Sequence, residues 1–223
     1  MEGKIIAVEG LDGAGKATQT KKLVERLEKE GKKVVYCDFP HYNDKSSWLV
    51  REYLSGEFGD DYKKVDPRMA SVFYAVDRLI TYRDKIKSLY EDGYIVVFDR
   101  WTTANMLHQS MKAETSDKVD EIVNWIEKLE YESFGLPKPD MTIFLKVPYE
   151  YSFETLKSKD KNDGSIKQDI HERNIEFLKR SYENGVYVSD KYDWKVIECF
   201  EDKMRSIDSI HEELYGLVSN LVK

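Results

Sequence analysis

A glycine-rich segment at residues 8–18 constrains the fold of this chain more than any other feature. It reads VEGLDGAGKAT, follows a short apolar run at residues 5–8, and precedes a segment whose apolar residues have helical spacing. Gly10, Gly15 and Lys16 fit the pattern G-x-x-x-x-G-K, in which backbone N–H groups surround a phosphate and the lysine reaches the β- and γ-phosphates. A strand, a loop and a helix start in this order predict a phosphate-binding loop. Its residues are Gly10, Leu11, Asp12, Gly13, Ala14, Gly15, Lys16, Ala17 and Thr18.

Length, charge and cysteine content narrow the class of protein. A chain of 223 residues can form one α/β domain, and no apolar run approaches the ~20 residues of a membrane span. Cys37 and Cys199 lie far apart and fit no metal-binding spacing, so we expect two core thiols in a reduced, cytoplasmic protein. The formal net charge of −7 argues against general nucleic-acid binding, which needs basic surfaces.

The pattern of apolar residues predicts an α/β fold with parallel strands. Five short apolar runs read as strands, and helical stripes separate them. The expected strands are residues 5–8, 33–37, 94–100, 141–147 and 194–199. The expected helices include residues 48–54, 67–91, 103–111, 117–134, a segment from 169 to 185, and a last helix through residues 207–221. We interpret the helix at 117–134 as scaffold.

Several polar and aromatic residues fall where parallel strands end or on one face of a helix. Asp99 and Arg100 close the strand at 94–100, where an acid suits a magnesium ion and a base suits phosphates. Tyr74 and Arg78 are one helical turn apart and can face one planar ligand. Three further groups are candidates: Phe39 with Tyr42 as a pocket wall, Asn105 and His108 on one helix face, and the lysines of a polar segment at 157–167. That segment is typical of a solvated loop, and in a phosphoryl-transfer protein also of a closing lid.

Taken in order, these residues resemble the thymidylate kinase family of nucleoside-monophosphate kinases over nearly the whole chain. The resemblance rests on residues 9–16, Phe39-Pro40, the Tyr74/Arg78 pair, and Asp99-Arg100 followed by Asn105, with an acidic Asp169-x-x-Glu172 after the lid. It implies a five-stranded parallel sheet of order 2-3-1-4-5, Mg-ATP as donor, dTMP as acceptor, and a homodimer. We expect a single domain over residues 1–223 with a lid at about 157–168.

The resemblance also implies residue roles. Tyr74 would stack on thymine, Arg78 would hydrogen-bond a thymine carbonyl, and Asn105 would reach the base. Asp12 would lie near the acceptor sugar and magnesium, and Arg100 would hold the two phosphates in register. The other expected substrate contacts are Phe39, Pro40, Leu54, His108, Asp169 and His171. The expected catalytic cations are Lys16, Arg100, Lys157, Lys159 and Lys161, with Asp12 beside them.

The chain departs from the family at five places. Ala17 removes the hydroxyl that usually binds magnesium, which leaves Asp12, Asp99, Thr18 or water. Gly13 stands where some relatives carry a catalytic arginine, so the lid lysines would supply that charge. No arginine follows Phe39-Pro40, and His108 and His171 replace tyrosines near the sugar.

The sequence therefore predicts Mg-ATP-dependent phosphorylation of dTMP to dTDP. Another base preference, dUMP or dGMP, is one alternative, because the geometry of the Tyr74/Arg78 pair is not fixed by sequence. A nucleotide-binding switch that hydrolyses ATP slowly is an alternative from another class.

Overall fold

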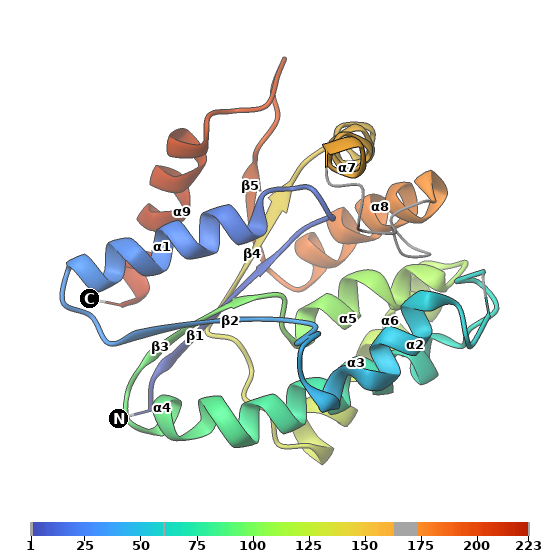
Figure 1. Cartoon of the computed structure of the whole chain (residues 1–223), viewed down its shortest axis with the longest axis horizontal. Helices are drawn as coiled ribbons and strands as arrows, with labels where there is room; N and C mark the ends of the chain where they lie inside the picture. Colours follow the sequence, from blue (N-terminus) through green and yellow to red (C-terminus); the bar gives the residue numbers. More distant parts are fainter. Residues whose placement is uncertain (1, 60, 163–173, 223) are drawn as a thin grey trace.

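Five parallel strands form the centre of the molecule in the order β2-β3-β1-β4-β5 (Figure 1). The structure is a computed structural model, and it describes residues 2–59, 61–162 and 174–222, with the backbone alone for residues 159–162. The strands are β1 (Lys4–Glu9), β2 (Val34–Asp38), β3 (Ile95–Asp99), β4 (Met141–Lys146) and β5 (Lys195–Glu198). The order and the parallel pairing confirm the prediction.

Helices cover both faces of the sheet, because the residues of β1 alternate between two cores. Ile6 and Val8 pack with α1 and α9 on one face, whereas Ile5 and Ala7 pack on the other face around Phe98 and Trp101. Figure 1 shows α1 beside α9, with α3, α4 and α5 across the sheet. The helices are α1 (Lys16–Lys29), α2 (Trp48–Ser55), α3 (Pro67–Thr81), α4 (Lys87–Glu91), α5 (Thr102–His108), α6 (Ser116–Glu127), α7 (Tyr149–Asn162), α8 (Ile175–Lys191) and α9 (Ile207–Leu221).

Short 3₁₀ and π turns interrupt the longer predicted helices. The helix expected at 67–91 contains the π turn η2 (Tyr82–Ile86), and the one expected at 117–134 ends in a second π turn, η4 (Lys128–Ser133). The 3₁₀ turns are η1 (Lys45–Ser47) and η3 (Ser110–Lys112). A π turn shifts the side chains after it around the helix axis, and such turns often lie at functional sites.

Two predicted boundaries are wrong. Residues 157–162 continue α7 and do not form a loop, because lysine is compatible with a helix. The helix expected to stop at Gly185 runs on to Lys191. A Cβ at Gly185 would lie 2.7 Å from the Phe144 ring, so this glycine permits close packing of α8 on β4 and does not end the helix.

Other sequence predictions are confirmed. Cys37 and Cys199 are free thiols in the core. Across the part of the chain that the structure describes, none of the helices has the length and apolar character that crossing a bilayer requires.

Candidate functional site

The glycine-rich loop lies between β1 and α1, at the carboxyl edge of the sheet. Gly15 precedes α1 with a φ of 87°, a left-handed conformation that glycine adopts without strain. A Cβ at Gly10 would approach the Leu145 carbonyl oxygen to 3.0 Å, so the loop also needs glycine there for close approach. Lys16 folds back into the loop, where its Nζ donates to the Leu11 carbonyl oxygen at 2.8 Å. The loop is therefore preformed around its lysine.

Arg100 follows β3 in an unusual backbone conformation. Its φ is 70°, in the left-handed region that side chains other than glycine rarely adopt. The Arg100 N–H donates to the Val8 carbonyl, and the next N–H, of Trp101, donates to Glu9 Oε1 at 3.0 Å. The Thr103 hydroxyl donates to the same oxygen at 2.7 Å. The buried Glu9 thus fixes the backbone that directs Arg100, a role that sequence reasoning missed.

Two neighbours hold the Arg100 guanidinium in the cavity beside the loop. Its Nη2 donates to Asp12 Oδ1 at 2.6 Å, and its Nη1 donates to His108 Nε2 at 2.6 Å. Because arginine has no acceptor, His108 accepts at Nε2 and carries its proton on Nδ1. Asp12, Arg100 and His108 were expected near the acceptor, and the structure brings these three side chains together.

Burial and mutual charge shape the electrostatics around Lys16 and Arg100. Burial, together with the nearby Arg100, lowers the pKa of Lys16. Burial also raises the pKa of Glu9 and of Asp99. Burial alone would raise the pKa of Asp12, but Arg100 and Lys16 outweigh it and hold the pKa well below its usual range. Two buried cations that lie close together favour a polyanionic ligand, which would relieve their repulsion.

A pocket opens beside this cluster and joins it to the residues expected around a base. Every substrate-contact residue predicted within the described part of the chain lines it. The lining comprises Asp12, Phe39, Pro40, Tyr42, Leu54, Tyr74, Arg78, Arg100, Ala104, Asn105, His108, Gln109 and Phe177. Phe177 was missed, although its ring stacks parallel to His108 at 6.1 Å between centroids.

Arg78 does not reach the pocket as a free guanidinium. Its Nε and Nη2 donate to the two carboxylate oxygens of Glu130, at 2.7 and 2.6 Å, and both side chains are almost fully buried. Asn105 Nδ2 donates to Glu130 Oε1 at 2.7 Å and to the Ser71 carbonyl at 3.1 Å. The interpretation of residues 117–134 as scaffold is therefore wrong for Glu130, because the π turn η4 directs it inward.

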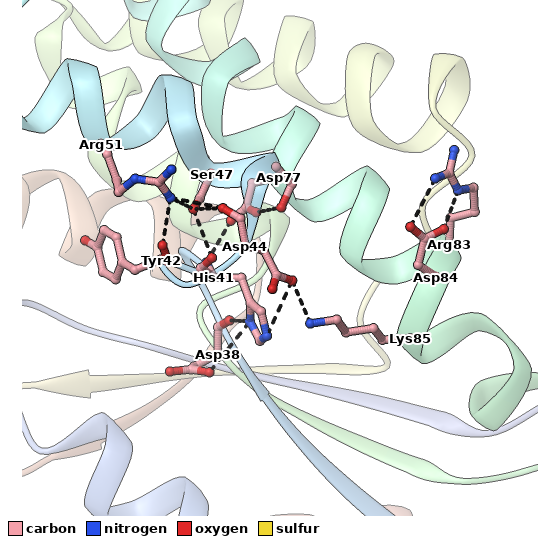
Figure 2. A network of polar contacts seen from close by, with 11 residues as sticks. Asp38, His41, Tyr42, Asp44, Ser47, Arg51, Asp77, Arg83, Asp84 and Lys85 are labelled. Atoms are coloured by element: carbon pink, nitrogen blue, oxygen red, sulfur yellow. Dashed lines mark hydrogen bonds and ion pairs between the residues drawn. The ribbon is translucent and has the colours of Figure 1, made fainter.

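A network of polar contacts fixes the loop that carries Phe39, Pro40 and Tyr42 (Figure 2). Asp77, buried on α3, accepts from the His41 N–H at 2.8 Å and from the Ser46 hydroxyl at 2.6 Å. Arg51 donates to the Tyr42 carbonyl at 2.7 Å. The loop is thus tied to the helix that carries Tyr74 and Arg78, and the two walls of the pocket are held in one geometry.

The remaining predicted residues lie apart from the pocket or outside the residues that the structure describes. Thr18 is exposed on the first turn of α1. Lys157 is exposed on α7, where its Nζ lies 3.3 Å from Glu154 Oε1 and over the Phe153 ring. Asp169 and His171 lie outside the described residues, as do the side chains of Lys159 and Lys161. The lid therefore stays a prediction.

The sheet order, the glycine-rich loop and the adjoining pocket define a P-loop nucleoside-monophosphate kinase fold. A family model described as thymidylate kinase matches residues 8–213. The chain belongs to the thymidylate kinase family.

Known proteins of this family resemble the chain over most of its length. A thymidylate kinase of Mycobacterium tuberculosis (strain H37Rv) is 30% identical over 178 residues, which cover 79% of this chain and 81% of the relative. One from Caldicellulosiruptor saccharolyticus is 27% identical and covers 100% and 99% of the two chains. The solved thymidylate kinase of Candida albicans has the same fold, with a TM-score of 0.71 at 19% identity, covering 98% of this chain and 92% of that one.

Proposed function

We propose that this enzyme transfers the γ-phosphoryl group of Mg-ATP to dTMP, giving ADP and dTDP. One observation carries the proposal: a single pocket joins Arg100, next to the glycine-rich loop, to an aromatic ring, a guanidinium and an amide that suit a base. Arg100 and Asp12 line the same pocket as Tyr74, Arg78 and Asn105. A monophosphate bound there would place its phosphate toward Arg100 and its base toward Tyr74.

The reaction places a modest chemical demand on the side chains. The attacking group is an oxygen of the acceptor phosphate, which is already anionic, so no strong general base is needed. The difficulty is to bring two polyanions into line and to stabilise the negative charge that spreads in the transition state. Lys16 would contact the β- and γ-phosphates of the donor, and Arg100 would exchange its contacts with Asp12 and His108 for the phosphates.

Magnesium fits the acidic residues near the loop. Among the described residues there is no group of three or more His, Cys, Asp or Glu side chains that could hold a metal. Mg²⁺ in kinases commonly uses one or two carboxylates, with phosphates and water as its other ligands. Asp12 and Asp99 would supply those oxygens. Both are close enough to act on the charges of Lys16 and Arg100, the two side chains that would contact the phosphates. The bound ion would neutralise phosphate charge and orient the γ-phosphoryl group.

Four further features complete the proposal on the strength of the family resemblance. The chain would form one domain over residues 1–223, with a lid at about 157–168 that brings Lys157, Lys159 and Lys161 to the transferring group. The enzyme would act in the cytoplasm as a homodimer. Sedimentation velocity tests the dimer directly, and a single species with the mass of one chain would contradict it.

A coupled assay of ADP release tests the reaction. Purified enzyme, ATP and magnesium are combined with dTMP, dUMP, dGMP or buffer, and we expect the highest kcat/KM with dTMP. Turnover with another monophosphate but not with dTMP would overturn the substrate. ATP hydrolysis that no monophosphate stimulates would favour the nucleotide switch.

A further inference from the structure

Glu130 lies beneath the pocket on the π turn η4 and accepts from both side chains that would contact the base. We propose that Glu130 is a positioning residue that determines base specificity: it fixes which hydrogen-bonding groups of Arg78 and Asn105 face the ligand. The inference rests on the proposed function. The base end of the pocket consists of Arg78, Asn105 and Glu130.

The contacts of Arg78 leave one part of its guanidinium for a ligand. Nε and Nη2 are both committed to the Glu130 carboxylate, in the paired geometry that arginine and a carboxylate favour. Both of these hydrogen bonds leave out Nη1, for which the described residues provide no hydrogen-bond acceptor. Arg78 also lines the pocket. Since a guanidinium has only donors, Arg78 offers the ligand an N–H group.

The orientation of the Asn105 amide follows from the same carboxylate. Its Nδ2 lies 2.7 Å from Glu130 Oε1 and 3.1 Å from the Ser71 carbonyl oxygen, and both of these atoms are acceptors. Rotating the amide by 180° would set an oxygen against two oxygens, so this orientation is determined by chemistry. With the nitrogen used, Asn105 can offer a ligand only its Oδ1, an acceptor.

A donor beside an acceptor selects one kind of base edge. Thymine and uracil present a carbonyl oxygen, O4, next to the N3–H donor, and this pair complements Arg78 Nη1 and Asn105 Oδ1. Cytosine presents the reverse, an amino group next to an acceptor nitrogen, so both contacts would become repulsive. Guanine shows the same pair as thymine at O6 and N1–H, so the base end separates keto from amino edges and not pyrimidines from purines.

Burial makes this arrangement rigid. Glu130 is 0% exposed and Arg78 is 1% exposed, so water does not replace a lost contact. Only a carboxylate accepts at both oxygens. Glutamine at this position would offer a donor in place of one acceptor. Arg78 would then lose one of its two acceptors in either orientation of the amide, and with the nitrogen at the Oε1 position Asn105 would lose its acceptor as well.

The first test uses the unmodified enzyme and four monophosphates. dUMP and dCMP differ at the edge that faces the base end, and neither carries the thymine methyl group. We expect kcat/KM for dUMP to exceed that for dCMP by about 10³-fold or more, as sites built to bind a specific N–H or O–H discriminate. dTMP methylated at N3 should lose about 10²-fold or more relative to dTMP. Near-equal use of dUMP and dCMP would overturn the proposal.

The second test is Glu130→Gln, with Glu127→Gln as the matched control. Glu127 lies on the preceding helical turn, where it pairs with the exposed Lys138 away from the pocket. We expect Glu130→Gln to lower the dUMP:dCMP ratio by about tenfold or more while the KM for ATP stays unchanged. Glu127→Gln should leave the ratio unchanged. A purely structural role for Glu130 would lower turnover with both nucleotides equally and preserve the ratio.

The two tests separate this inference from the proposed reaction. If the unmodified enzyme phosphorylates no thymidine or uridine monophosphate, the proposed function fails. If it phosphorylates dTMP and dUMP, and folded Glu130→Gln enzyme keeps the original dUMP:dCMP ratio, the role of Glu130 fails alone. Should Glu130→Gln not fold, the N3-methyl substrate still decides whether Asn105 presents an acceptor.

Discussion

The phosphate end and the base end of the pocket differ in how their charged side chains are paired. At the phosphate end, burial and the nearby Arg100 lower the pKa of Lys16, and the Arg100 backbone is held at a φ of 70°. At the base end, Arg78 and Glu130 form a closed, fully buried pair. The phosphate end therefore holds two neighbouring cations whose repulsion a polyanionic ligand would relieve, whereas the charges of the base end are paired without a ligand. Substitutions at the phosphate end should therefore reduce activity without reducing stability, whereas substitutions at the base end should reduce both.

Lys16→Ala tests the phosphate end and should have the largest effect on turnover. We expect kcat to fall about 10³-fold, because the lysine stabilises charge on the transferring group. The free energy of unfolding should change by less than about 1 kcal/mol, since burial and the nearby Arg100 already destabilise the charged lysine. Steady-state kinetics and urea unfolding measure the two quantities.

Lys22→Ala is the matched control for Lys16→Ala. Lys22 lies on the same helix and pairs with the exposed Asp208, away from the loop. We expect both its kcat and its stability to remain near the unmodified values. Near-normal turnover of Lys16→Ala would contradict the assignment of the loop.

Arg78→Ala tests the base end, where we expect losses of both stability and binding. Removing one partner of a buried ion pair leaves Glu130 uncompensated and should cost about 3–5 kcal/mol of unfolding free energy. The KM for dTMP should rise while the KM for ATP stays unchanged. Arg68→Ala breaks an exposed pair with Glu121 and should cost less than about 1 kcal/mol. An equal rise in both KM values would refute the role of Arg78.

Sequence reasoning placed a residue correctly where its position follows from a strand or a short motif. The apolar runs determine the sheet, and the strand ends place Asp99 and Arg100 at the same edge as the loop. Tyr74 and Arg78 were found because four-residue spacing puts them on one helix face. All of these are local patterns, which a single sequence contains.

The residues that position these side chains were not predictable in the same way. Glu130 is 52 residues from Arg78 in sequence, and its inward direction depends on a π turn that interrupts an otherwise ordinary amphipathic helix. Glu9 is the last residue of the largely apolar strand β1. It nevertheless fixes the backbone after Arg100 through contacts with residues more than 90 positions away in sequence. Buried carboxylates of this kind read as surface charge in the sequence, because their partners are set only by the tertiary fold.

Asp77→Asn tests whether the loop beside the base end is positioned from α3. The amide keeps one acceptor but loses the second, so either the His41 N–H or the Ser46 hydroxyl loses its partner. We expect a loss of about 1–2 kcal/mol in unfolding free energy and a severalfold rise in the KM for dTMP alone. Ser46→Ala, which removes only the hydroxyl, should have the smaller effect on both. A rise in the KM for ATP would show that the two ends are not separate.

Lys112, which does not line the pocket, provides the smallest expected effect, and its contacts contrast with the paired charges of the base end. Its Nζ lies 3.1 Å from the Tyr53 hydroxyl and 3.3 Å from the Val65 carbonyl, and neither group is a carboxylate. Burial lowers its pKa from 10.5 to about 8. Between these values the unfolded chain holds a proton that the folded chain has released, so stability rises with pH across this window.

Lys112→Met isolates that contribution to stability. Below pH 8 the folded protein carries the full cost of a buried, charged lysine, and the variant should be the more stable of the two. That advantage should shrink by about 1–2 kcal/mol as the pH rises from 8 to 10, less than the full pKa shift would give because the side chain is only partly buried. Tyrosine ionisation affects both proteins and cancels in the difference. An advantage that stays constant over this range would mean that Lys112 keeps its proton in the folded protein.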